Sequence, residues 1–384
     1  MTHRRLALCS ALALPAALYA LTATRVAAQG CPVAAVRANG PAHAGGWNLD
    51  RHRELVRTLR SQLGVSEGYQ PPRTAWGHPD LEGAWTSDAV HGVPRDRPAQ
   101  FGTRMFLTDA EYQAREAQEA KTRDDALNAS GVGTAGRHRA WRGETTFRLT
   151  SLTVDPPDGR TPAVTPQAAA RRAGRDRGSF GAGPFNSPAD FTLYDRCITR
   201  GIVGSILPVV YGNGNRILQT PDALVFNYEM VHDTRVIPVD GRPHIADSIR
   251  QYLGDARGRW DGDTLVVETT NLTAETSIGA NGNGLRHSAG MRIVEHFTRV
   301  SDDVVLYDVT VDDPQTYLQP FTYAIPLISP PGFRPLPYEC HEGNGAVKYA
   351  LSGAREYEAR VAEALAKGLP PPEPSSSNHE DVAR

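Results

Sequence analysis

Lysine is nearly absent from this 384-residue chain, which has only Lys121, Lys348 and Lys367 among its 41 basic residues. None of the three stands in a phosphate-binding loop, where lysine follows the pattern Gly-x-x-x-x-Gly. Schiff-base and pyridoxal chemistry also depend on lysine and have few candidates here. Acidic residues number 43 and the net charge is −2, which argues against a generally basic nucleic-acid-binding protein. We therefore expect no nucleic-acid partner.

Local motifs of the common cofactor and catalytic classes are also missing. Gly212-Asn213-Gly214 reaches Ile217 where a dinucleotide-binding loop needs its third glycine. His341-Glu342 lacks the second histidine of zinc proteases, and neither Ser205 nor Ser288 fits the Gly-x-Ser-x-Gly pattern of esterases. The spacing of the candidate metal-binding histidines matches no metal motif: His232, His287, His296 and His341. We therefore expect no cofactor and no metal.

Long apolar segments occur only at the N-terminus, where Leu6 to Leu21 follow the basic pair Arg4-Arg5. Val26-Ala27-Ala28 then matches the small-x-small pattern of a signal-peptidase site, so we interpret residues 1–28 as a cleaved signal peptide. The apolar run is shorter than the roughly 20 residues of a membrane-spanning helix. Lipidation at Cys31 is an alternative, although the preceding residues lack the usual leucine. The mature protein is expected to be periplasmic or secreted, without a membrane span.

Cysteine is scarce as well, with four residues in the whole chain. Cys9 leaves with the signal peptide and Cys31 lies near the new terminus, so Cys197 and Cys340 are the two cysteines of the folded body. In an oxidising compartment these two are natural disulfide partners. The alternative is that one of them is a reactive thiol.

Helix signals stand at both ends of the expected domain. Asn48 to Leu63 has leucines at helical spacing and stops before Gly64, which predicts a short helix within an N-terminal extension, residues 29–78. Thr108-Asp109-Ala110-Glu111 is a capping box and predicts a helix over 109–121. Another helix is predicted over 352–367. The arginine-rich stretch 129–190 is interpreted as a solvated loop.

From Ile217 onward the hydrophobic period changes to two, as in half-buried strands. Asp240-Gly241 and Asp261-Gly262-Asp263 have the composition of tight turns. Strands are predicted at 224–230, 264–269, 291–300, 304–311 and 321–327. Successive strands with short turns predict a mainly β domain over 79–368 with flanking helices. Its antiparallel meander is expected to close, fully or partly, as a lipocalin-like barrel, followed by a disordered tail over 369–384.

Three polar clusters beside turns are the candidate sites. In the first, His232, Asp233 and Arg235 follow a strand, and an adjacent histidine and carboxylate could act as base and orienting group. The alternative is a turn in which Asp233 caps backbone amides. The second could hold a planar or anionic ligand through guanidinium groups and an aromatic face, or could be an ion-paired loop: Arg250, Tyr252, Asp255, Arg257, Arg259 and Trp260.

The third cluster is Tyr338 to Asn344, with Glu339 and His341 beside Cys340. A disulfide from Cys340 to Cys197 would place His341 near Arg196 and Arg200 and could tune it for proton transfer. The alternative is a disulfide loop with solvated charges. Glu268 is the leading candidate for an inward-facing catalytic carboxylate, although buried carboxylates are usually paired with arginine and a structural ion pair is the more common role.

Several longer motifs resemble a family of exported bacterial proteins, most of them uncharacterised. The motifs are Asp80-Leu81-x-Gly83-x-Trp85, Asp195 to Gly201 (DRCITRG), Asp240 to His244 (DGRPH), Gly254 to Thr269 (GDARGRWDGDTLVVET) and Cys340 to Asn344 (CHEGN). The similarity covers roughly residues 79–356. It implies export and the limits of the β-rich domain, and it assigns no catalytic residue.

The leading hypothesis is an exported enzyme that acts on a small, partly apolar molecule by metal-independent acid–base catalysis. It would be a lyase, isomerase, cyclase or hydrolase, with His232 or His341 as the base and a neighbouring carboxylate as its orienting group. Arg235, Arg250 or Arg257 would hold developing negative charge. One alternative is a lipocalin-like carrier of a hydrophobic ligand, and another is a surface-interaction protein whose clusters share no cavity. The oligomeric state is left open.

Overall fold

The computed structural model describes residues 46–128, 147–175, 185–209 and 211–373. The predicted signal peptide, residues 29–45 and most of the predicted tail lie outside these residues. The described part contains five α-helices: α1 (Leu49–Gln62), α2 (Asp109–Asn128), α4 (Pro166–Arg175), α5 (Ile202–Ile206) and α6 (Ala346–Ala366). Within this part, no helix is both long and apolar enough to cross a membrane.

The β-strands, by contrast, lie mostly in the second half of the chain. They are β1 (Gly83–Thr86), β2 (Thr153–Asp155), β3 (Gly214–Gln219), β4 (Ala223–Tyr228), β5 (Thr234–Pro238), β6 (Asp255–Asp261), β7 (Thr264–Thr270), β8 (Arg292–Arg299), β9 (Val304–Asp312) and β10 (Phe321–Ile328). The period-two pattern thus predicted β4, β7, β8, β9 and β10 at nearly their observed bounds.

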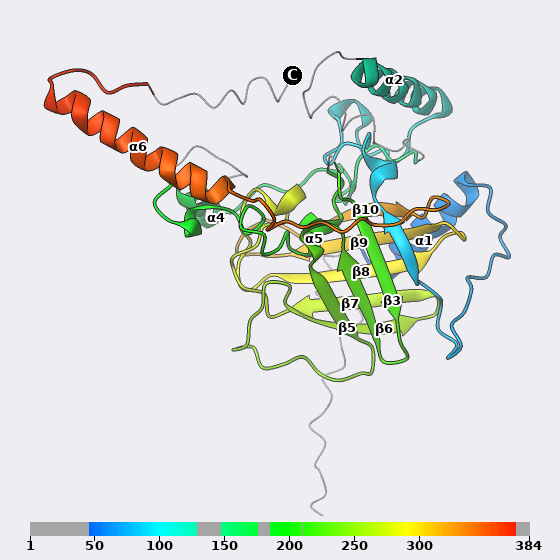
Figure 1. Cartoon of the computed structure of the whole chain (residues 1–384). Helices are drawn as coiled ribbons and strands as arrows, with labels where there is room; N and C mark the ends of the chain where they lie inside the picture. The colour runs from blue at the N-terminus through cyan, green and yellow to red at the C-terminus, as the bar shows by residue number, and fades with distance from the viewer. Residues whose placement is uncertain (1–45, 129–146, 176–184, 210, 374–384) are drawn as a thin grey trace, which may run out of the picture. The chain divides into compact units, whose positions relative to one another are not determined.

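The strands form a single antiparallel sheet in the order β5-β4-β3-β1-β10-β9-β8-β7-β6, with β2 paired to β10 beside this path. Strands β3 to β5 make one meander and strands β6 to β10 make a second. Strand β1 joins the two, because it pairs with β3 on one side and with β10 on the other. In Figure 1 the green strands β3 and β5 cross in front of the yellower strands of the second meander.

The two ends of this strand order approach each other. A Cβ atom placed on Gly258 of β6 would lie 3.1 Å from Ile237 of β5 and 2.8 Å from Val239 just beyond it. Glycine at position 258 therefore permits the close approach of β5 to β6. The result is a nearly closed barrel, and the predicted β-barrel with flanking helices is confirmed.

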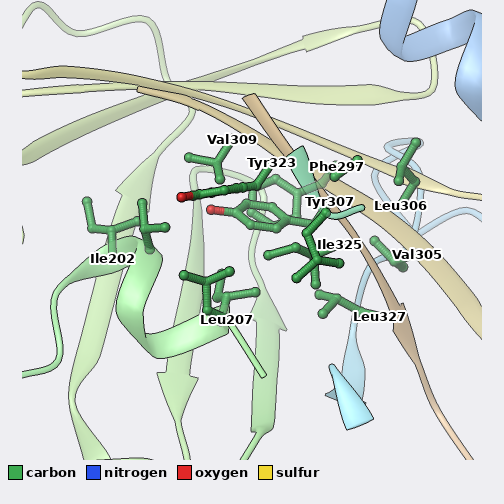
Figure 2. Close-up of a cluster of buried hydrophobic side chains, with 14 of the residues drawn as sticks. Ile202, Leu207, Phe297, Val305, Leu306, Tyr307, Val309, Tyr323, Ile325 and Leu327 are labelled. Carbon is green, nitrogen blue, oxygen red and sulfur yellow. The ribbon is translucent and has the colours of Figure 1, made fainter. Parts of the chain in front are cut away.

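Buried aromatic and aliphatic side chains pack together inside the barrel. Phe297 of β8 lies 4.7 Å from Tyr307 of β9 and 5.0 Å from Phe226 of β4, measured between ring centroids. Figure 2 shows Ile202, the first residue of α5, and Leu207, just after its last residue, facing Tyr307 and the side chains of β10. Inward-facing and outward-facing side chains alternate along each strand, so every second residue of a strand can point into this core.

Helix α1 follows its sequence signals closely. The Asn48 side chain accepts a hydrogen bond from the Arg51 amide at 3.1 Å, and Gly64 has a φ of +68° just beyond the last turn. Buried Leu55 and Leu59 face the sheet, and Arg60 donates to the carbonyl of Val300 at 3.2 Å. The helix expected in an N-terminal extension therefore packs directly on the barrel.

The remaining helix predictions had mixed outcomes. The capping box of α2 is present, since Thr108 donates from its amide to the Glu111 carboxylate at 2.8 Å. Helix α6 begins six residues earlier than the predicted 352. The loop interpretation of 129–190 was wrong where α4 forms, because several alanines follow Pro166 at the helix start, and where the mostly buried strand β2 pairs with β10. Asp240-Gly241 begins a long connection between β5 and β6 and does not close a hairpin.

Candidate functional site

A disulfide between Cys197 and Cys340 joins two of the loops that carry predicted site residues. The sulfur atoms are 2.03 Å apart and the Cα atoms 5.6 Å apart, which confirms the predicted pairing. Beside it, the Asn344 side-chain amide donates to the Asp195 carbonyl at 3.3 Å and to Cys197 Sγ at 3.1 Å. The loop after β10 is thereby fastened to the turn before α5.

The first and third predicted clusters meet at His232. Its Nδ1 lies 2.9 Å from the backbone carbonyl oxygen of Tyr338. A carbonyl can only accept, so Nδ1 donates in this contact, and in the neutral form of the imidazole the lone pair is then on Nε2. The group that orients the imidazole is therefore a carbonyl and not the neighbouring carboxylate expected from the sequence. Asp233 instead accepts from the Thr234 amide at 2.9 Å and contacts Thr199, while burial raises its pKa.

The backbone that presents His232 has an unusual conformation. Val231 has a φ of +65° and His232 a φ of +43°. Positive φ is rare for non-glycine residues and strained for a β-branched one, and such strain persists only where the surroundings impose it. Glu229 helps to hold this turn, because its carboxylate accepts from the Gly214 amide at 2.8 Å and from the Leu336 amide at 3.0 Å.

His232 lines a groove with a volume of about 640 Å³, within the usual range for small-molecule sites. Its floor is the outer face of β1, β3 and β4, and the segment 334–338 forms the opposite wall. Figure 1 shows this orange segment running across the barrel between β10 and α6. The residues of the groove are Glu82, Gly83, Ala84, Arg216, Ile217, Leu218, Asn227, Glu229, His232, Arg334, Pro335, Leu336, Pro337 and Tyr338.

The groove combines apolar and cationic side chains. Leu218 is 44% exposed and Leu336 is 70% exposed, so apolar surface is available to a ligand. Arg216 and Arg334 are exposed along the same groove. An apolar surface with a few convergent charges suits a small organic molecule that carries negative charge at one end.

Behind Tyr338 lies a buried arginine among three tyrosines. Arg200 is 1% exposed, and its Nη1 donates to the Gly212 carbonyl at 3.5 Å. Burial lowers the pKa of Arg200 to about 10, which still leaves it charged at neutral pH. The hydroxyl of Tyr338 is hydrogen-bonded to Tyr194 and to Tyr211, and burial raises the pKa of both partners. Tyr194 and Tyr211 therefore remain neutral and supply no counter-charge.

His341 and Glu339 are exposed in the loop around the disulfide and are not among the residues that line the groove. Arg235 is 3% exposed inside the barrel, where it donates to both carboxylate oxygens of Glu295, at 2.9 and 2.5 Å. Glu268 lies on the opposite face of the sheet and pairs with Arg292 at 2.7 Å. The carboxylate that faces the interior is therefore Glu295, not Glu268.

The second predicted cluster is separate from the groove. Arg257 donates to Asp255 at 2.7 Å and to the Pro243 carbonyl at 2.9 Å. Trp260 stacks near His78 with 5.2 Å between ring centroids. Arg250 donates to the Leu272 carbonyl at 3.1 Å, and Tyr252 is 39% exposed. None of these four side chains lines the groove, and Arg257 and Trp260 lie on strand β6 and not in a loop.

Helix α1 supplies a histidine to the one group of described residues that has the donors of a metal site. His52 Nδ1 lies 2.5 Å from Asp308 Oδ2, and His296 Nδ1 lies 2.7 Å from Asp308 Oδ1. Trp47 donates to Asp308 at 2.9 Å, and His52 Nε2 lies 2.7 Å from the Thr298 hydroxyl. These are ligand types that Zn²⁺ accepts. Hydrogen bonds within the network already engage both nitrogens of His52 and both carboxylate oxygens of Asp308.

No family model, curated protein or solved structure matches this chain. The functional argument therefore depends on the geometry of the site alone. Sequence reasoning found His232 and Tyr338 but missed Glu229, Arg216 and Arg334 as residues of the same groove. The alternation along β3 and β4 places Arg216 and Asn227 on the outer face, and it is the only local signal that could have found the groove floor.

The network at α1 predicts how stability depends on pH. Burial lowers the pKa of His52, so the unfolded chain binds a proton there more readily than the folded protein. Burial alone would raise the pKa of Asp308, but His296 and His52 outweigh it and hold that pKa well below its usual value. Both shifts stabilise the folded state at neutral pH. Stability should therefore fall as the pH drops below about 6.5, and fall further below about 4.

This dependence can be measured by urea unfolding of the wild type and of His52→Gln at pH 7.5 and pH 5.5. The loss of unfolding free energy on acidification should be smaller in the variant. It should not vanish, because burial lowers the pKa of His287 as well. His341→Gln, at an exposed site, should behave like the wild type. Equal pH dependence in wild type and His52→Gln would contradict the assignment.

Proposed function

We propose that the protein is an exported enzyme that acts on a small, partly apolar organic molecule, with His232 as the general base. The observation that carries the proposal is the contact from His232 Nδ1 to the Tyr338 carbonyl, which leaves the lone pair on Nε2 in a residue that lines the groove. Export is supported by the sequence of residues 1–28, and the disulfide is typical of oxidising compartments.

The chemistry follows from the charges beside His232. Nε2 would take a proton from the ligand, and the Tyr338 carbonyl would stabilise the imidazolium through the Nδ1 proton. Arg216 and Arg334 are the groove cations that could hold developing negative charge, in place of the expected Arg235, Arg250 and Arg257. A lyase, isomerase, cyclase or hydrolase could use this set. His341 is a weaker candidate for the base because it does not line the groove.

The activity can be sought by incubating the purified mature protein with small-molecule extracts and identifying compounds that are consumed. His232→Ala should then lower kcat/KM for such a compound by about 100-fold or more, as is usual for loss of a general base. His341→Ala should change it less than about 2-fold, within the usual spread for a residue outside the site. Full turnover by His232→Ala would show that this assignment of the base is wrong.

A carrier of a small hydrophobic ligand is the second candidate, and the barrel with its apolar groove walls favours it. Packed side chains such as Phe297 and Tyr307 occupy the barrel interior, so a carried ligand would lie in the groove. Native mass spectrometry distinguishes the two candidates. A carrier should return its ligand unchanged after hours of incubation, whereas an enzyme should release a product of different composition or structure.

A further inference from the structure

Arg200 is a buried cation without an anionic partner among the described residues. Its Nε and Nη2 atoms are buried and make no hydrogen bond, and its single bond, from Nη1 to Gly212, is long at 3.5 Å. Glu229 attracts this charge from a distance, and its oxygens already accept from two backbone amides. A buried charge is costly unless it is paired and hydrogen-bonded.

Nε and Nη2, the two donors of Arg200 without a partner, are a pair that can bind both oxygens of a carboxylate. In a planar guanidinium, the N–H bonds of Nε and of Nη2 point the same way along one edge, with a spacing that matches the two oxygens of a carboxylate. Nη1, at the other end, is the nitrogen that the Gly212 carbonyl engages. Arg200 therefore keeps its bidentate edge unoccupied by protein groups.

We propose that Arg200 binds the carboxylate of a small organic acid through Nε and Nη2, and that the apolar body of this acid extends into the groove beside His232. The carboxylate would be the charged end of the small molecule in the proposed function, and only the use of the same groove depends on that function. Tyr338 connects the two places, because its side chain lines the groove and its hydroxyl belongs to the tyrosine cluster around Arg200.

The surroundings favour a monoanionic carboxylate over a phosphate. Glu229 acts on Arg200 electrostatically and is part of the groove, so a second negative charge on the ligand would meet repulsion. The hydroxyls of Tyr194, Tyr211 and Tyr338 can donate to a carboxylate oxygen. The rings of Tyr211 and Tyr338 have centroids 6.4 Å apart, and Tyr211 is 39% exposed, so this pair lies between the buried Arg200 and solvent-accessible surface. A ligand would replace the hydrogen bonds between these phenols with its own.

Isothermal titration calorimetry with benzoate, benzamide and inorganic phosphate tests the proposal on the mature protein. Benzamide has the size of benzoate without its charge, so benzoate should bind at least ~10-fold more tightly if a charge-assisted fork holds it. Phosphate should compete weakly or not at all. Equal affinity for benzoate and benzamide, or stronger binding of phosphate than of benzoate, would overturn the proposal.

The variant Arg200→Lys keeps the charge and removes the fork, and it should lose at least ~10-fold in benzoate affinity. Arg250→Lys makes the same substitution outside the groove and should bind benzoate like the wild type. If Arg200→Lys does not fold, Tyr338→Phe removes one hydroxyl next to the fork and should weaken benzoate binding by several-fold. If Arg200→Lys folds and binds benzoate like the wild type, the proposed site is wrong. If Arg200→Lys does not fold, unchanged benzoate binding by Tyr338→Phe has the same meaning.

Failure of this inference can be told apart from failure of the proposed function. His232→Ala should keep benzoate binding while it loses turnover of any identified substrate. If the protein binds benzoate but its turnover does not need His232, the anion site at Arg200 is supported and the assignment of the base is wrong. If turnover depends on His232 but the protein does not prefer benzoate to benzamide, the assignment of the base is supported and the anion site is wrong.

Discussion

Replacing Glu295 by glutamine should destabilise the protein by about 3–5 kcal/mol, the usual cost of breaking a buried ion pair by removing one partner. Glu295 is 0% exposed, and it accepts from Arg235 and, at 3.2 Å, from the Tyr307 hydroxyl. Burial would lower the pKa of Arg235, but attraction to Glu295 outweighs it and raises that pKa. Without Glu295, Arg235 would remain a charged group inside the barrel with no anion beside it.

Glu268→Gln is the matched control. Glu268 stands one strand away on β7 and also pairs with an arginine, but its pair with Arg292 is on the outer face and partly exposed. Its loss should cost only about 0–1 kcal/mol. The double variant Arg235→Met/Glu295→Leu should recover much of the stability, since replacing both charges leaves no uncompensated ion. Chemical denaturation measures all three, and equal losses in the two single variants would contradict the difference in burial.

Removal of the disulfide should have a comparable effect. The bridge connects residues 143 apart in the sequence, and the chain-entropy relation gives about 5 kcal/mol for a loop of that length. Measured losses are more often about 2–4 kcal/mol. The double variant Cys197→Ser/Cys340→Ser should therefore unfold at clearly lower urea concentration than the oxidised wild type.

The same variant should also weaken the groove. The carbonyl that orients His232 belongs to Tyr338, two residues before Cys340. Benzoate affinity and any turnover should fall more than unfolding of the barrel alone would explain, measured at temperatures where the variant is folded. A reducing agent should shift the wild type toward the variant and leave the variant unchanged. A wild-type unfolding midpoint that is insensitive to reductant would contradict this prediction.

Local patterns predicted much of this fold because each depends on neighbours in the chain. Alternating burial along β4 follows from period-two spacing, and the limits of α1 follow from Asn48 and Gly64. Strand β1 was missed as a structural element because its four residues are too short for a periodic signal. Its position between β3 and β10 depends on pairing with residues far away in the sequence.

The candidate site was predictable only in part, and Glu268 and Glu295 show why. Both are carboxylates on apolar strands, yet only Glu295 faces the barrel interior. A strand's two faces exchange when the register moves by one residue, so side-chain direction depends on pairing with the neighbouring strands. His232 was identified from its adjacent carboxylate, but its actual partner is a backbone carbonyl brought near by the loop that the disulfide fastens.

The sequence by itself determined strands β4 and β7 to β10, the capped helices α1 and α2, and the pairing of Cys197 with Cys340. These depend on residue spacing, caps and the number of cysteines left in the folded body. Only the tertiary structure decided that Arg235 lies inside the barrel and that His52 reaches Asp308. It alone also left the bidentate edge of Arg200 without a protein partner. These outcomes depend on contacts between distant segments, and such contacts leave no periodic trace in the sequence.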